Sequence, residues 1–159
     1  MSVDTRKVAD RRELHFNTVE DILADLDDIS RKKVRALGNW TPGQVYRHLA
    51  TTMNSSIDGF GFTAPWPFRM IGKLIMKKRL MNKPMSPGFK LPANAAKVLE
   101  PAPTGDDEGL ATLRSALHRL QTESKRARSP FLGELTREEW NRMHCRHAEL
   151  HLSFLTPEL

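Results

Sequence analysis

Three of the six histidines in this sequence lie within eight residues of one another near its C-terminus. On a helix, His144, His147 and His151 share one face with Trp140. His147 and His151 are four residues apart, so their imidazoles lie one turn apart and could converge on one metal ion. His144 and His151 are two turns apart and could not easily join the same ion. The spacing therefore predicts a metal-ligand pair at His147 and His151.

A third ligand is available on a second helix, where His48 lies at the edge of an apolar face. Three histidines from two antiparallel helices would make an open site with water in the remaining positions. The competing interpretation is that these are core histidines, each bonded to a neighbour. Ala148 follows His147, so the glutamate of the zinc-protease motif HExxH is absent, which argues against a metalloprotease. His15 and His118 are expected near the surface.

Capping signals define the helices that must position these side chains. TPGQ at 41–44 and TREE at 136–139 both read as capping boxes, which predicts helices over 42–58 and 137–155. Apolar residues at helical spacing predict two further helices, at about 18–36 and 106–128.

The predicted fold class is all-α, because no convincing strand pattern is present. We expect one helical domain over residues 1–159, a four-helix bundle with a long crossover connection after the second helix. That connection, 59–105, is basic and rich in proline. A connection of this length between helices is often functional.

The positive charge is concentrated in that connection. The chain has a net charge of +6, yet 59–99 contains eight basic residues and no Asp or Glu. A basic, apolar stretch at 67–81 could form a helix, and we expect it to be a lid that packs its apolar side on the bundle and gives a positive rim to a pocket. A helix lying in a membrane interface is the alternative.

Other features of the sequence indicate the cellular compartment and the partners that we expect. A single cysteine, Cys145, excludes an intrachain disulfide and fits a reducing compartment. The N-terminal residues contain no apolar secretory signal and no stretch is long enough to span a bilayer, so a cytoplasmic location without a transmembrane segment is expected. No helix-turn-helix or RNA-binding signature is present, which argues against a nucleic-acid partner.

Two segments, GNWTPGQVYRHLA at 38–50 and WNRMHCRHAELHLSFLTP at 140–157, resemble the DinB/YfiT-like superfamily, and more narrowly one of its uncharacterised branches. The resemblance runs from about Leu14 to Pro157. It implies a four-helix bundle with a long connection, and a metal triad at His48, His147 and His151. His144 is a further histidine outside this triad, and it is a candidate to donate a proton or to hydrogen-bond one of the ligands. Polar side chains expected near the ligands are Thr52, Ser56 and Glu149.

Characterised members of that superfamily include metal-dependent transferases that use a low-molecular-weight thiol. The resemblance therefore implies a transferase whose divalent ion, of the Zn, Ni or Fe type, holds the thiol as a thiolate beside a small-molecule substrate. Aromatic and methionine residues in 60–81 could wall its pocket. The alternative is a non-catalytic module that binds a metal or small ligand, and a third class is an anion- or membrane-surface protein. A homodimer is plausible in either case.

Overall fold

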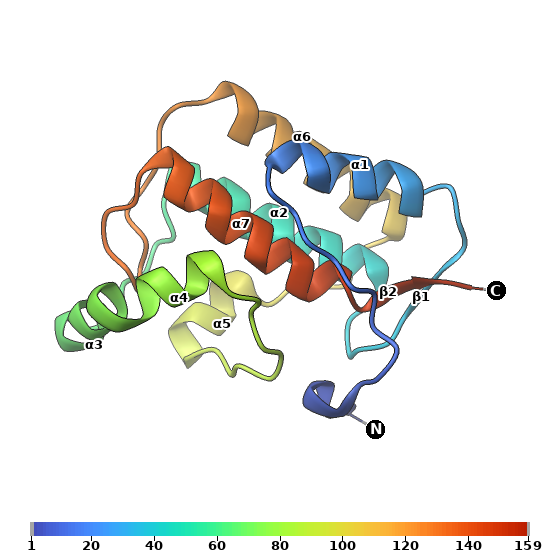
Figure 1. Cartoon of the computed structure of the whole chain (residues 1–159), viewed down its shortest axis with the longest axis horizontal. Coiled ribbons are helices and arrows are strands. Elements are labelled where there is room, and N and C mark those ends of the chain that lie inside the picture. Colours follow the sequence, from blue (N-terminus) through green and yellow to red (C-terminus); the bar gives the residue numbers. More distant parts are fainter. Residues whose placement is uncertain (1, 159) are drawn as a thin grey trace.

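Four long helices surround the main core in the computed structural model, which describes residues 2–158. They are α1 (Val19–Ile29), α2 (Pro42–Asp58), α6 (Asp106–Thr122) and α7 (Arg137–Leu152). The pairs α2–α6, α2–α7, α1–α6 and α1–α7 are in contact, as Figure 1 shows. Met1 and Leu159, the ends of the predicted domain, lie outside the described residues. The fully buried side chains of this core include Ile22, Leu26, Ile29, Leu49, Ile57, Leu113, Leu117, Leu120 and Leu152.

Side-chain caps begin three of these helices, as local sequence predicts. Thr41 and Thr136 each accept a hydrogen bond from the backbone three residues on, and Gln44 and Glu139 bond back to the cap residue. Both predicted capping boxes are therefore confirmed, and α2 has the predicted bounds. α1 begins with a third such box, built on Thr18. These caps satisfy backbone donors that would otherwise lack partners at each helix start.

Helices α2 and α6 approach most closely at their N-termini, where each carries a glycine. A Cβ atom on Gly43 would lie 2.3 Å from the carbonyl oxygen of Thr104, and one on Gly109 would lie 2.4 Å from that of Gly43. The amide of Gly43 donates to Asp106 at 2.8 Å. Backbone therefore packs directly on backbone at this crossing, which fixes the start of the helix that carries His48.

A small antiparallel sheet corrects the all-α prediction. Strand β1 (Val34–Ala36) pairs with β2 (Leu155–Pro157), with Arg35 opposite Thr156. The predicted helix ends at 36 and 155 are thus wrong, since α1 stops at Ile29 and α7 at Leu152. Residues 34–36 and 155, which were predicted to be helical, belong to strands whose backbone groups pair across the sheet. The protein is therefore mostly helical with one two-stranded sheet.

Helix α6 also ends earlier than predicted, at Thr122 rather than 128. Arg126 lies beyond the helix and its guanidinium donates to the carbonyl oxygens of Leu120, Glu123 and Lys125. Arg126 therefore donates hydrogen bonds to carbonyl groups around the C-terminus of α6 from a position beyond the helix, rather than from its last turn.

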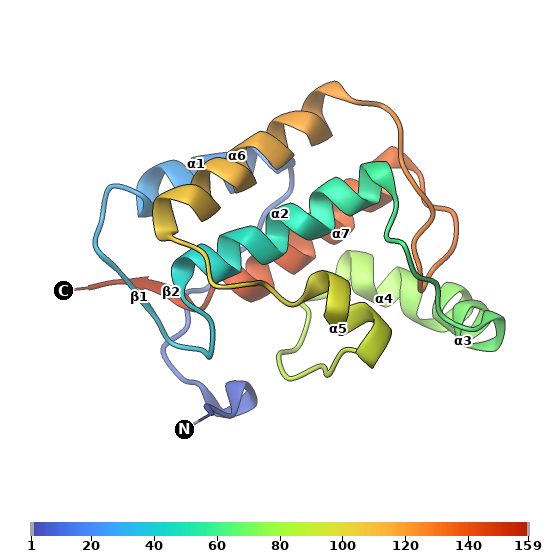
Figure 2. The ribbon, with the colours of Figure 1, turned by 180° about the vertical axis from the view of Figure 1, so that it is seen from behind.

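The connection between α2 and α6 contains shorter helices. The predicted helix at 67–81 is present as one continuous run, α3 (Trp66–Ile71), the π-helical turn η2 (Gly72–Met76) and α4 (Lys77–Asn82), which we call the tip helix. It is followed by α5 (Ala93–Leu99), which packs beside α2, as Figure 2 shows. A second core joins the connection to α7 and contains Phe60, Met81, Ala95, Leu99, Leu132, Leu135 and Trp140.

The expected lid is not formed by the first part of the tip helix. α4 does contact α7, but α3 and η2 turn most of their apolar side chains to solvent, Leu74 being 77% and Ile75 71% exposed. α3 lies at one end of the molecule, away from the β1–β2 sheet at the other (Figures 1 and 2). Within residues 2–158, none of the helices combines the length and apolar composition that crossing a bilayer requires.

Candidate metal centre

His48 is held in one orientation by a backbone carbonyl of the connection. It lies in the second turn of α2, is 4% exposed, and its Nδ1 is 2.7 Å from the carbonyl oxygen of Leu99, the last residue of α5. A carbonyl oxygen can only accept, so Nδ1 must carry the proton. The Nε2 atom of His48 is consequently left with its lone pair, which is the state of a metal ligand.

The three predicted ligand residues come together. His147 and His151 lie on successive turns of α7 with ring centroids 4.6 Å apart, and the ring of His48 lies 4.9 Å and 4.5 Å from theirs. One nitrogen from each of the three residues lies within 4.8 Å of the other two. The structure therefore places a three-histidine group that could hold a metal ion between α2 and α7.

One pair of nitrogens in the cluster has a separation suited to one ion. Nε2 of His48 and Nε2 of His147 are 3.1 Å apart. Two nitrogens that are each about 2.0–2.2 Å from one ion, at bond angles between about 90° and 110°, lie roughly 2.8–3.6 Å apart. The observed distance falls in this range. The donor set, three neutral imidazoles, is also one that Zn, Ni and Fe accept.

Burial keeps these imidazoles neutral. Burial lowers the pKa of His48, although its hydrogen bond to Leu99 opposes the effect. The pKa values of His147 and His151 are lowered well below the ordinary 6.5, first by burial and then by neighbouring histidines. Neutral nitrogens do not repel a cation, so the electrostatics of the cluster are compatible with a divalent ion.

An aromatic ring forms one wall of the cluster. The indole of Trp40, the residue before the α2 cap, stacks on His151 with ring centroids 5.4 Å apart and lies tilted against His48 at 4.8 Å. His147 and His151 are only half-buried, whereas His48 is enclosed. The cluster therefore has a closed side at His48 and a side that reaches toward solvent.

His144 is separate from the cluster. Its Nε2 is 2.9 Å from Ser56 Oγ, and its ring stacks on Trp140 with centroids 5.4 Å apart. Burial lowers its pKa to about 3. Its hydrogen bond goes to Ser56 and to none of the three clustered histidines. His15 and His118 are exposed, as predicted.

The expected polar neighbours of the ligands are engaged elsewhere. Thr52 donates to the carbonyl oxygen of His48, and Ser56 pairs with His144. Glu149 accepts from Arg146 and from the amide of Phe16. Leu99 provides the bond to His48 instead. The bond to Leu99 could not be predicted, because a backbone oxygen has no signature in the sequence. The place of Trp40 beside the histidines was not predicted either, although this residue directly precedes the predicted capping box.

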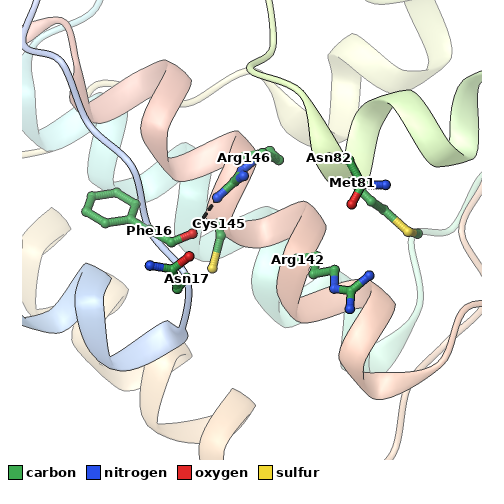
Figure 3. Close-up of a pocket in the computed structure, with 7 residues that line it drawn as sticks. All are labelled: Phe16, Asn17, Met81, Asn82, Arg142, Cys145 and Arg146. Atoms are coloured by element: carbon green, nitrogen blue, oxygen red, sulfur yellow. Dashed lines mark hydrogen bonds between the residues drawn. The ribbon is translucent and has the colours of Figure 1, made fainter.

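A pocket lies beside α7 and is lined in part by residues of that helix, as Figure 3 shows. It has a volume of about 200 Å³, and its walls include Phe16, Met81, Arg142 and Cys145. Burial raises the pKa of the Cys145 thiol to about 11, so this thiol is protonated at neutral pH and is a poor nucleophile. This pocket therefore offers no reactive thiol at neutral pH.

These observations define a mostly helical protein with a three-histidine group between two of its long helices. A family model described as a protein of unknown function (DUF1569) matches residues 8–158, and the chain belongs to that family. No curated protein and no solved structure matches the chain. The family description assigns neither a ligand nor a reaction.

Proposed function

We propose that His48, His147 and His151 bind one divalent metal ion of the Zn, Ni or Fe type. The observation that carries this proposal is the convergence of three ring nitrogens within 4.8 Å, together with a His48 tautomer that leaves Nε2 free to ligate. Three protein ligands leave coordination positions vacant, as in catalytic rather than structural metal sites. The half-buried side of the cluster is where a small-molecule substrate would reach the ion.

The finer proposal is a metal-dependent transferase that uses a low-molecular-weight thiol. It is supported by the resemblance of 38–50 and 140–157 to the DinB/YfiT-like superfamily, and by the packing of the four long helices as that superfamily's bundle would require. A bound ion would supply the positive charge that stabilises a thiolate. Leu99 would hold His48 in its ligating tautomer, and Trp40 would shield one side of the site from water. Cytoplasmic location and homodimer formation remain predictions.

The alternative is a binding module that holds a metal without chemistry. It has the same three ligands, and His48, the most enclosed of them, would serve either role. What distinguishes the two is whether water or an added thiol can occupy the vacant positions. Among the described residues, no acidic or basic side chain outside the cluster is hydrogen-bonded to the three histidines. Catalysis would therefore depend on the ion itself.

Metal content tests the first proposal. Protein produced without an affinity tag should contain a stoichiometric divalent metal by elemental analysis. His147→Ala should lose it, because two imidazoles hold an ion much more weakly than three. His118→Ala, which removes an exposed histidine from α6, is the matched control and should retain it. Equal metal content in the two variants would exclude the triad as the site.

A second experiment tests the transferase. Metal-loaded protein is incubated with a panel of biological thiols and electrophiles, beside His147→Ala and His118→Ala. Thiol conjugation that is lost only in His147→Ala supports the enzyme. Tight metal binding with no product from any pair, and no spectral change of a cobalt-substituted protein on adding thiols, would favour the binding module.

A further inference from the structure

The tip helix presents an apolar surface that no part of the described chain covers. Six of its side chains are more than half exposed: Trp66, Phe68, Met70, Ile71, Leu74 and Ile75. Met70 and Ile71 lie one turn before Leu74 and Ile75, so these four form a continuous stripe. Contiguous exposed apolar surface of this kind marks an interaction site.

The same helix is firmly seated by its inner side, so the exposure does not come from a lack of docking. A Cβ atom on Gly72 would lie 2.7 Å from the carbonyl oxygen of Phe131, which means that the backbones touch there. Lys77 forms an ion pair of 2.7 Å with Glu139 on α7, and Met81 is buried in the second core. The outward direction of the apolar stripe is therefore set by these contacts.

Charge on the tip helix has one sign. Lys73, Lys78 and Arg79 are exposed, and 59–99 contains no acidic residue that could neutralise them. Exposed apolar side chains predominate in the first half of the helix, whereas Lys78 and Arg79 lie in its second half. The first part of the helix, α3, lies at the end of the molecule (Figure 1). Long lysine and arginine side chains can reach phosphate groups while neighbouring apolar groups enter a less polar layer.

We propose that the tip helix binds the surface of an anionic phospholipid membrane. Trp66, Phe68 and the stripe of Leu74 and Ile75 insert among the lipid chains near the headgroups, while Lys73, Lys78 and Arg79 contact lipid phosphates. Apolar and aromatic groups beside lysine and arginine are the composition of helices that lie in this interface. The projecting position of α3 lets it reach a broad surface before the rest of the molecule does.

Charge also decides against a second copy of this chain as the occupant. A symmetric pair would bring the same face of both molecules together. Lys73, Lys78 and Arg79 of both copies would then lie in one interface, with no acid in 59–99 to separate them. Such like-charge contacts are unfavourable, whereas an anionic lipid surface is complementary to them. This site lies on the opposite end of α2 and α7 from the histidine cluster and does not depend on the proposed metal.

Co-sedimentation of the full-length protein with vesicles tests the proposal. We expect binding to phosphatidylcholine vesicles that contain phosphatidylglycerol and little binding to vesicles of phosphatidylcholine alone. Replacing Lys73, Lys78 and Arg79 by Gln should weaken partition to the anionic vesicles by about 100-fold, given the usual contribution of each basic residue near such a surface. Leu74→Ser with Ile75→Ser should weaken it as well, since both side chains are exposed and their loss leaves the core intact.

The control removes three exposed basic residues elsewhere, with Lys7, Arg31 and Lys125 replaced by Gln, and should bind almost as the unchanged protein does. Trp66 fluorescence should shift to the blue on adding anionic vesicles, and Trp66→Phe should abolish the shift. Equal loss in the control and tip variants would overturn the proposal. So would absence of vesicle binding, or a dimer that Leu74→Ser and Ile75→Ser dissociate, which would assign the face to a second copy.

Discussion

Hydrogen bonding decides which nitrogen of a buried histidine carries its proton. His48 donates from Nδ1 to Leu99, so its Nε2 faces His147 without a hydrogen. The Ser56 hydroxyl donates to the Met53 carbonyl oxygen, so it must accept from Nε2–H of His144. Two histidines with similar burial are thus in opposite tautomers, one able to ligate through Nε2 and the other not.

His144 should make stability depend on acidity. Burial lowers its pKa to about 3 in the folded protein, against 6.5 in the unfolded chain. The unfolded chain therefore binds a proton in this window that the folded protein does not, so the free energy of unfolding falls as pH drops from 6.5 toward 3. His144→Gln, which keeps a donor for Ser56 but does not titrate, should reduce this dependence in urea unfolding measured across the window. An unchanged slope would contradict the assignment.

Trp40 should position the proposed ligands without touching the ion. Trp40→Ala removes the ring that packs on His48 and His151, and we expect metal affinity to fall by about tenfold while far-ultraviolet circular dichroism stays the same. Trp40→Phe should restore part of the loss because it returns an aromatic wall. The remote, exposed Trp66→Ala is the control. A loss of equal size in both alanine variants would show that the effect is not local.

At the scale of elements, the glycine crossing of α2 and α6 should tolerate no side chain. Gly43→Ala places a Cβ atom 2.3 Å from a backbone oxygen, so the helices must move apart, and we expect a loss of about 1–3 kcal/mol in the free energy of unfolding. Gly105→Ser, at a position with open space and at the start of α6, should be neutral or slightly stabilising. Denaturant unfolding distinguishes them, and equal stabilities would show that the crossing relaxes freely.

Helix starts could be predicted from the sequence, but most helix ends could not. The caps at Thr41 and Thr136 depend on residues three positions apart, which are legible locally. The end of α7 depends on Leu155–Pro157 pairing with a strand more than a hundred residues earlier, which no local pattern reports. The helical faces of α2 and α7 offered convergence of the three histidines as one interpretation, and the family resemblance implied it. The bond to the Leu99 carbonyl oxygen could not be predicted, because it depends on the path of the connection.

For the whole molecule, metal binding should couple to global stability, because the ligands link α2 to α7. A ligand that binds only the folded protein, at about 100 times its Kd, adds about 2.7 kcal/mol. Unfolding temperature should therefore rise by roughly 5–10 °C in wild type and in His118→Ala. His151→Ala should show almost none of this rise in a thermal-shift titration. A full rise in His151→Ala would mean that the ion binds elsewhere.

The separation of the three ligands along the chain bears on biosynthesis. His48 is translated well before its two partners, since His147 follows it by 99 positions and His151 comes one helical turn later. Until α7 emerges, the nascent chain offers only one of the three imidazoles. Metal loading is therefore expected only after α7 has emerged, and translation arrested before residue 147 should yield a ribosome-bound chain that retains no ion at this site.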